Sequence, residues 1–305
     1  MKVVATRRYP GPAFDELADV EIMSLAELEA PRPEVEALVV ANEPVPFDRF
    51  PNLRVVANFG VGYDRIDVAA CAVRGIVVTN TPGVLTDATA DLAFALILAA
   101  RRQVVEGDRL VRAGGWAGSW SEGRLAEEVT GSTLGIVGLG RIGTAVARRA
   151  RGFELRVLYT RRRRVDTDLA EFCELDALLA EADIVTLHAP LTPETRGLID
   201  ARRLALLRDG ACLVNTARGE LVEERALVAE LVSGRIRAGL DVFAHEPDVP
   251  RQLLELPNVV LTPHLGSATR QTREAMTRLV VDNLLALTRG DPPLTPVAGA
   301  VPSSP

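Results

Sequence analysis

Three histidines are the side chains of this chain best suited to exchange a proton near neutral pH. His188 directly follows a β-branched run, His264 follows another after two residues, and His245 stands beside Glu246 in a predicted loop. Ligands of parallel sheets bind outside the carboxyl ends of the strands. His264 is expected at such a strand end, which favours it as a site residue. Ser267, three residues later, suits the start of a helix. We therefore take His264 as the candidate proton donor, against the alternative that a lone histidine serves only the structure.

A glycine-rich turn predicts a second kind of chemistry. Residues 138–143 follow the pattern G-x-G-x-x-G, after a strand-like run at 134–137 and before a helical pattern at 142–151. These two neighbours distinguish a dinucleotide site from an ordinary turn. The glycines allow a tight turn, close approach of a pyrophosphate, and close packing of helix on strand, while the helix N-terminus offers N–H groups to phosphates. We expect the cofactor to bind Gly138, Leu139, Gly140, Arg141, Ile142 and Gly143.

The residues after the next strand bear on which dinucleotide binds. NAD-binding folds usually place Asp or Glu there, about 20 residues beyond the glycines, to hold the ribose 2′-hydroxyl. Here the strand at 156–159 is followed by Thr160 and four consecutive arginines. An arginine can bind a 2′-phosphate with two hydrogen bonds, whereas a carboxylate would repel it. Thr160, Arg161 and Arg162 therefore predict a preference for NADP(H), with NAD(H) still possible; the alternative is a solvated basic loop.

Short β-branched runs alternate with helical patterns along the chain and must position these residues. We expect strands at 3–5, 37–40, 54–57, 76–79, 133–137, 156–159, 183–187, 211–214, 238–241 and 259–261, and helices at 14–17, 65–73, 87–102, 142–151 and 267–287. The predicted fold is α/β, with two doubly wound parallel-sheet domains. The larger, at 99–285, is a Rossmann-type dinucleotide-binding domain. It is inserted into a discontinuous domain made of 1–98 and 286–305.

Composition argues against several classes of partner. The chain has 35 basic and 41 acidic residues and a net charge of −6, whereas nucleic-acid binders usually carry the opposite balance. Its longest apolar run, 92–100, is far shorter than the ~20 residues that cross a bilayer, and the N-terminus does not resemble a signal peptide. Cys71, Cys173 and Cys212 lie far apart, which predicts reduced thiols in a cytoplasmic protein and no metal site.

Five blocks of sequence resemble the D-isomer-specific 2-hydroxyacid dehydrogenases and occur in that family's order. They are 58–64, 138–143, 187–192, 214–219, and 239–247 followed by 262–264. The likeness runs from about residue 50 to Pro296 and is greatest to the glyoxylate/hydroxypyruvate and hydroxyphenylpyruvate reductase branch. It implies that 1–98 with 286–305 bind the substrate, and that the protein is a homodimer.

The resemblance also implies catalytic roles. Arg218 matches the family's substrate-binding arginine, His264 its acid/base and Glu246 the partner carboxylate, while Val61 and Gly62 match the backbone N–H groups that grip the substrate carboxylate. The chemistry is consistent: a guanidinium can engage the adjacent carboxylate and carbonyl of a 2-oxo acid. A protonated imidazole can then give a proton to the oxygen that becomes negative.

Further positions match the family's cofactor site or its dimer arm. The implied cofactor-lining residues are His188, Pro190, Thr195, Thr216, Gly266 and, near the nicotinamide amide, Asp241. For Asp241 a turn cap is an alternative. Trp116 and Trp120 resemble the dimer arm, and loop packing is the alternative for both.

The function predicted is hydride transfer from NAD(P)H to a small 2-oxo acid such as glyoxylate or hydroxypyruvate, giving the D-2-hydroxy acid. One alternative is an NAD-linked dehydrogenase of another 2-hydroxy acid or of phosphite. Another is a non-catalytic dinucleotide-sensing binding protein, because a fold does not prove turnover. Relatives that use formate carry Gln at the position of Glu246, so formate is not expected.

Overall fold

The computed structural model describes residues 1–118 and 125–299 and divides the chain into two compact units. Unit 1 comprises Met1–Leu85 and Ser267–Pro305, and unit 2 comprises Thr86–Gly266. The domain boundaries predicted from the sequence, near 98 and 285, fall inside two long helices. In the structure each of these helices belongs to one unit, because each packs on a single sheet.

Unit 1 is built on a parallel sheet with strand order β2-β1-β3-β4-β5. The strands are β1 (Lys2–Ala5), β2 (Val20–Ile22), β3 (Val35–Val40), β4 (Val55–Asn58) and β5 (Val77–Thr79). Valines dominate these segments, and β-branched residues suit a strand buried on both faces. β2 was not predicted; it is a partly exposed edge strand of three residues and carries little apolar pattern.

The helices of unit 1 are mostly short. They are η1 (Pro12–Glu16), η2 (Leu25–Glu27), η3 (Phe47–Arg49), α1 (Val68–Val73) and α8 (Arg270–Arg289). The helix predicted at 14–17 is the 3₁₀ turn η1. The helix predicted at 65–73 is α1, which begins only after Asp67, whose carboxylate accepts a hydrogen bond from the N–H of Ala70 at 2.8 Å.

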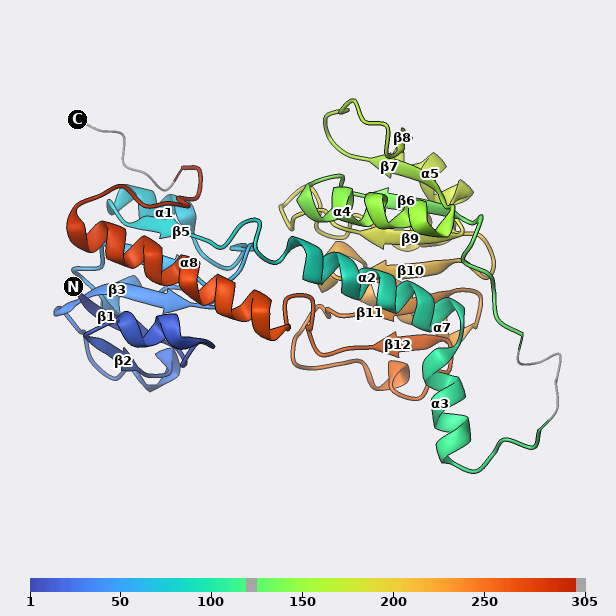
Figure 1. Ribbon diagram of the computed structural model, residues 1–305, viewed down its shortest axis with the longest axis horizontal. Helices are drawn as coiled ribbons and strands as arrows, with labels where there is room; N and C mark the ends of the chain where they lie inside the picture. Colours follow the sequence, from blue (N-terminus) through green and yellow to red (C-terminus); the bar gives the residue numbers. More distant parts are fainter. Residues whose placement is uncertain (119–124, 300–305) are drawn as a thin grey trace. The chain divides into compact units, whose positions relative to one another are not determined.

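The long helix α8 lies across the sheet of unit 1 (Figure 1). After α8 the chain returns to the β5 edge, where Pro296 forms an isolated bridge with Thr79. The sequence predicts only that 286–305 belong to the first domain.

Unit 2 contains a seven-stranded parallel sheet with the doubly wound order β12-β11-β10-β9-β6-β7-β8. The strands are β6 (Thr133–Val137), β7 (Arg156–Thr160), β8 (Glu171–Phe172), β9 (Ile184–Leu187), β10 (Cys212–Asn215), β11 (Arg237–Leu240) and β12 (Val259–Leu261). All but the two-residue β8 were predicted. The α/β class with two parallel-sheet domains, one of them Rossmann-type, is confirmed.

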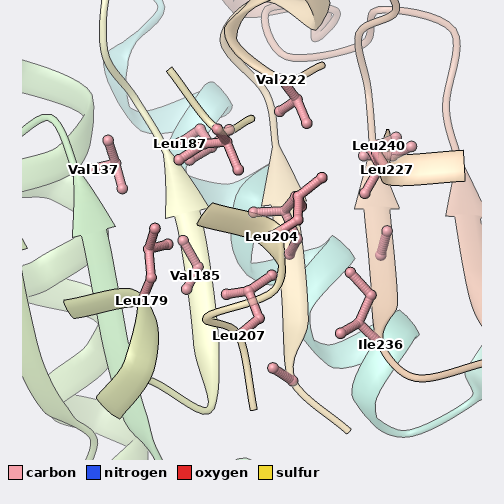
Figure 2. Close-up of a cluster of buried hydrophobic side chains, with 14 of the residues drawn as sticks. Val137, Leu179, Val185, Leu187, Leu204, Leu207, Val222, Leu227, Ile236 and Leu240 are labelled. Carbon is pink, nitrogen blue, oxygen red and sulfur yellow. The ribbon is translucent and has the colours of Figure 1, made fainter. Parts of the chain in front are cut away.

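Helices cover both faces of the unit 2 sheet. They are α2 (Thr86–Arg101), α3 (Val104–Arg112), α4 (Arg141–Ala150), η5 (Arg151–Phe153), α5 (Leu175–Glu181), α6 (Ala201–Leu204), η6 (Gly219–Leu221), α7 (Glu224–Val232) and η7 (Arg251–Leu253). α2 and α4 cover one face, where their buried residues share a cluster with Cys212 and Val214 of β10. Leu213 between them belongs to the cluster on the opposite face. Figure 2 shows part of that cluster, including Val185 and Leu187 of β9. This alternation buries both faces of the sheet and leaves the carboxyl ends of the strands to carry polar side chains.

α3 was not predicted, and it extends away from the sheet of its unit (Figure 1). It is separated from α2 by Gln103, whose positive φ of 53° interrupts the helix. None of its residues is buried. Its apolar residues Val104 and Val111 are exposed, so α3 contributes nothing to the core of unit 2.

No helix within 1–118 and 125–299 is long and apolar enough to cross a membrane. In the same part of the chain no group of His, Cys, Asp or Glu side chains is arranged to hold a metal ion.

Candidate active site

His264 and Glu246 are brought together by two loops at the carboxyl end of the unit 2 sheet. Nδ1 of His264 lies 2.7 Å from Oε2 of Glu246, and Oε1 of Glu246 accepts a hydrogen bond from the N–H of Phe243 at 3.2 Å. Burial raises the pKa of the Glu246 carboxyl, but the hydrogen bond and charge of His264, together with the N–H of Phe243 and the charge of Arg218, lower it overall. Glu246 thus remains a carboxylate that holds Nδ1, and Nε2 of His264 faces away from this bond.

The backbone at His264 has a left-handed φ of 54°, which is uncommon for a histidine. Asp241, at the end of β11, holds this backbone in place. Its carboxylate is completely buried and accepts hydrogen bonds from Thr262 Oγ1 at 2.6 Å, Leu265 N at 2.6 Å and Gly266 N at 2.8 Å. Burial raises the pKa of Asp241, and these hydrogen bonds partly offset the rise. Asp241 is therefore a cap of the histidine loop, and its predicted contact with the nicotinamide stays a prediction.

Arg218 lies in the loop that follows β10, at the N-terminus of η6. Asn215, the last residue of the strand, shapes this loop: its Nδ2 donates to Arg218 O at 2.8 Å and its Oδ1 accepts from Ala217 N at 3.0 Å. The positive charge of Arg218 contributes to the lowered pKa of Glu246. Arg218, Glu246 and His264, predicted from three separate blocks, thus share one electrostatic environment.

Gly219, which was not among the predicted site residues, allows the two loops to come into contact. A Cβ atom at Gly219 would overlap the peptide group that joins Phe243 to Ala244. Only glycine allows this close approach of the Arg218 loop to the segment leading to Glu246. The sequence signal was present, because glycine follows Arg218 directly, but its contact lies 24 residues away and could not be identified.

The glycine turn has the geometry that a dinucleotide requires. Gly138 has a φ of 101°, and a Cβ there would lie 2.6 Å from the backbone N of Ala189. A Cβ at Gly143 would collide with the carbonyl of Gly138, whereas none of the described atoms lies within 4 Å of a Cβ at Gly140. Gly138 and Gly143 are thus needed for packing, and Gly140 leaves open space above the N-terminus of α4.

Two buried polar atoms at the carboxyl ends of the neighbouring strands β9 and β10 have no hydrogen-bond partner among the described residues. They are Nδ1 of His188, directly after β9, and Oγ1 of Thr216, directly after the neighbouring strand β10. Burial lowers the pKa of His188 to about 4, so its ring is neutral near pH 7, and Nε2 contacts Thr186 Oγ1 at 3.0 Å. Unsatisfied buried polar atoms are costly, and a bound cofactor could satisfy both. Both residues were predicted to line the cofactor, and these residues fit a dinucleotide.

The basic run after β7 lies beside the glycine turn. Nη1 of Arg161 donates to the carbonyl of Leu139 at 3.1 Å, which places this guanidinium next to the predicted phosphate site. Arg161 and Arg162 are both exposed, and Thr160 ends the strand. In another loop, Thr195 Oγ1 donates to Pro190 O at 2.7 Å, so Thr195 shapes the segment that contains Pro190.

Val61 and Gly62 lie in the loop after β4 in unit 1. Their backbone N–H groups make no hydrogen bond within the described part of the chain. Such paired N–H groups suit an anion. Of the two tryptophans, Trp116 is 68% exposed, and Trp120 lies outside the described residues.

Comparison with known proteins gives a consistent result. Residues 94–266 match the model of the D-isomer specific 2-hydroxyacid dehydrogenase NAD binding domain. A glyoxylate reductase of Pyrococcus horikoshii is 49% identical over 96% of this chain and 95% of its own length. One from Korarchaeum cryptofilum is 52% identical over 81% of this chain and 76% of its own length.

Solved structures agree with these relatives. An NADPH-dependent glyoxylate/hydroxypyruvate reductase from Sinorhizobium meliloti, in complex with NADP and malonate, has a TM-score of 0.92 and 37% identity, and the match covers 100% of this chain and 98% of that one. A Thermus thermophilus protein has a TM-score of 0.91 and 45% identity, covering 98% and 100%. The chain therefore belongs to the D-isomer specific 2-hydroxyacid dehydrogenase family, and it is an oxidoreductase with an NAD(P)-binding domain.

Proposed function

We propose that this protein reduces glyoxylate, hydroxypyruvate or a closely related 2-oxo acid to the D-2-hydroxy acid, with NADPH preferred over NADH. The observation that carries the proposal is the 2.7 Å contact of His264 Nδ1 with Glu246, with the charge of Arg218 acting on the same carboxylate. The glyoxylate reductases at about 50% identity support the substrate class.

His264 supplies the proton in this proposal. Nδ1–H donates to the Glu246 carboxylate, which stabilises the imidazolium, and Nε2–H is left to face the substrate oxygen. NADPH, when bound, supplies the hydride to the carbonyl carbon. The carbonyl oxygen then gains negative charge and takes the proton from Nε2, so the imidazole becomes neutral as the hydroxyl forms.

Arg218 and the loop at Val61 and Gly62 orient the substrate. The guanidinium can bind the carboxylate and the carbonyl oxygen of a 2-oxo acid together, and it stabilises the charge that develops on that oxygen. The N–H groups of Val61 and Gly62, which make no hydrogen bond within the described part of the chain, would bind the substrate carboxylate, as the family resemblance implies. The malonate in the related Sinorhizobium meliloti structure is also a carboxylate ligand, which supports an acid-binding site in this family.

The preference for NADPH is supported by Arg161. Its guanidinium is anchored on the glycine turn through Leu139 O, and no acidic residue ends β7 to hold a ribose 2′-hydroxyl. Arg161, with Arg162 and Thr160, would bind the 2′-phosphate by charge-assisted hydrogen bonds. The residues proposed to hold the rest of the cofactor are the glycine turn, His188, Pro190, Thr195, Thr216, Asp241 and Gly266.

A homodimer in the cytoplasm is part of the proposal. Four side chains on and near α3 expose apolar surface, as a partner-binding arm would: Val104, Val111, Trp116 and Leu125. The three cysteines form no disulfide, as expected for a protein of a reducing compartment. Light scattering of the purified protein tests the assembly, and a monomer at micromolar concentration contradicts it.

The deciding experiment measures initial rates with NADPH and NADH against glyoxylate, hydroxypyruvate, pyruvate and hydroxyphenylpyruvate, for the wild type and for His264→Ala. We expect NADPH oxidation with one of these acids and a loss of at least about 100-fold in kcat for His264→Ala, with NADPH binding nearly unchanged. Surviving turnover in His264→Ala would show that another group gives the proton. NADPH binding without turnover of any acid by the wild type would favour the dinucleotide-sensing alternative.

A further inference from the structure

The loop of residues 60–62 is held through its carbonyl groups. Asn58, the last residue of β4, is completely buried, and its Nδ2 donates to Gly60 O at 3.1 Å and to Gly62 O at 2.9 Å. Its Oδ1 accepts the N–H of Asn42 at 2.7 Å. A backbone carbonyl can only accept and a backbone N–H can only donate, so this arrangement fixes the orientation of the Asn58 amide.

The third carbonyl of the loop is held by a second asparagine. Asn80 follows the neighbouring strand β5, and its Nδ2 donates to Val61 O at 3.0 Å. The backbone N–H of Thr81 also donates to Gly60 O at 3.0 Å. All three carbonyls of the loop therefore point toward β4 and β5 and have donors.

The planar trans peptide links these carbonyls to the N–H groups of the proposed substrate site. In a trans peptide the C=O of one residue and the N–H of the next point in opposite directions. The carbonyl of Gly60 therefore sets the direction of the Val61 N–H, and the carbonyl of Val61 sets that of the Gly62 N–H. Holding the carbonyls inward turns both N–H groups outward, where they make no hydrogen bond within the described part of the chain.

We propose that Asn58 and Asn80 are positioning residues for the substrate carboxylate, because they aim the N–H groups of Val61 and Gly62 through the intervening peptides. This inference rests on the proposed function of that loop. Neither side chain needs to touch the substrate. The two asparagines fix the direction of both N–H groups before the acid binds. The loop of residues 60–62 therefore loses little conformational freedom on binding.

Asn80 is itself anchored to the interior of unit 1 through the C-terminal segment. Its backbone N–H donates to Thr295 O at 3.2 Å, and Thr295 Oγ1 donates to Asn80 O at 2.7 Å. Thr295 in turn exchanges two hydrogen bonds with the buried side chain of Asn283 in α8, at 2.9 and 3.0 Å. The segment after α8 thus connects α8, through Thr295 and Asn80, to the loop of residues 60–62.

The test compares Asn80→Ala with the matched control Asn52→Ala. Asn52 also donates from Nδ2 to a backbone carbonyl of unit 1, Pro33 O at 2.7 Å, but it lies before β4, at the opposite end of that strand from the loop. For Asn80→Ala we expect the KM of the 2-oxo acid, and the inhibition constant of oxamate, to rise roughly tenfold. We expect a smaller change in kcat and none in the dissociation constant of NADPH. Asn52→Ala should keep wild-type values of all four.

A second variant separates positioning from general stability. Thr295→Val keeps the shape of the side chain and removes the hydroxyl that holds Asn80, so it should raise the KM in the same direction by a smaller factor. Combined with Asn80→Ala it should add less than its own effect, because both act through one loop. Unchanged KM in a folded Asn80→Ala variant, while the wild type reduces the acid, overturns the inference and leaves the proposed function standing. A wild type that neither reduces a 2-oxo acid nor binds oxamate overturns both.

Discussion

Gly219 lies directly against the peptide that joins Phe243 to Ala244, in contact so close that no Cβ fits. This contact joins the loop of Arg218 to the segment that leads to Glu246. The geometry of the proposed catalytic groups therefore depends on a residue with no side chain.

Gly219→Ala is expected to destabilise the protein by about 1–3 kcal/mol and to reduce kcat/KM for the 2-oxo acid by at least tenfold, because the two loops must separate. Gly152→Ala is the control: no described atom lies within 4 Å of a Cβ there. Thermal unfolding and steady-state rates measure both effects. Wild-type activity in Gly219→Ala would mean that the loops tolerate the separation.

Glu246→Gln should reduce kcat for reduction by about 100-fold, because the amide keeps the shape of the side chain but removes the charge that stabilises the imidazolium of His264. The dissociation constant of NADPH should stay unchanged. Glu255→Gln on another surface segment provides the matched change of charge and should behave as the wild type. If Glu246→Gln retains full kcat, Glu246 does not support proton transfer.

His188 predicts an acid-dependent loss of stability. Burial lowers its pKa from 6.5 to about 4, so between these values the unfolded chain binds a proton that the folded chain does not. The unfolding free energy contributed by the neutral ring is fully present above pH 6.5 and decreases as the pH falls. The loss is complete near pH 4 and amounts to a few kcal/mol, at about 1.4 kcal/mol per pKa unit.

His188→Gln should therefore flatten the dependence of unfolding free energy on pH between about 6.5 and 4, as measured by urea denaturation. His245→Gln removes an exposed histidine of the same unit and controls for the loss of an imidazole. An identical profile in wild type and His188→Gln would show that the ring becomes protonated in the folded protein without cost.

Arg161→Asp combined with Arg162→Ala should shift the ratio of kcat/KM values from NADPH toward NADH by about 100-fold. Two cations that can bind a 2′-phosphate are lost, and the new carboxylate repels it and can hold a 2′-hydroxyl instead. Arg163→Ala, one residue beyond, tests whether the effect is only a change of general charge. An unchanged ratio in the double variant would mean that the phosphate is recognised elsewhere.

Local patterns in the sequence were sufficient for much of the fold. Valine-rich runs predicted four strands of unit 1, and the residues before and after the glycine turn predicted β6 and α4, because burial on both faces and tight turns each require particular residues nearby in the chain. They did not reveal the edge strands β2 and β8, which are short and partly exposed, or α3, which packs on no sheet of its own unit.

The sequence by itself also determined which side chains could do the chemistry, since Arg218, Glu246 and His264 lie in recognisable blocks. The tertiary structure decided how they are held. Asp241 accepts a hydrogen bond from Leu265, 24 residues along the chain, and Thr295 donates one to Asn80, 215 residues away in the sequence. Such contacts depend on strand order and loop packing, which bring distant residues together without any periodic signal in the chain. The residues that hold the proposed site in place, such as Asp241 and Thr295, could therefore be identified as supports only from the fold. The proposed catalytic residues could be identified from the sequence.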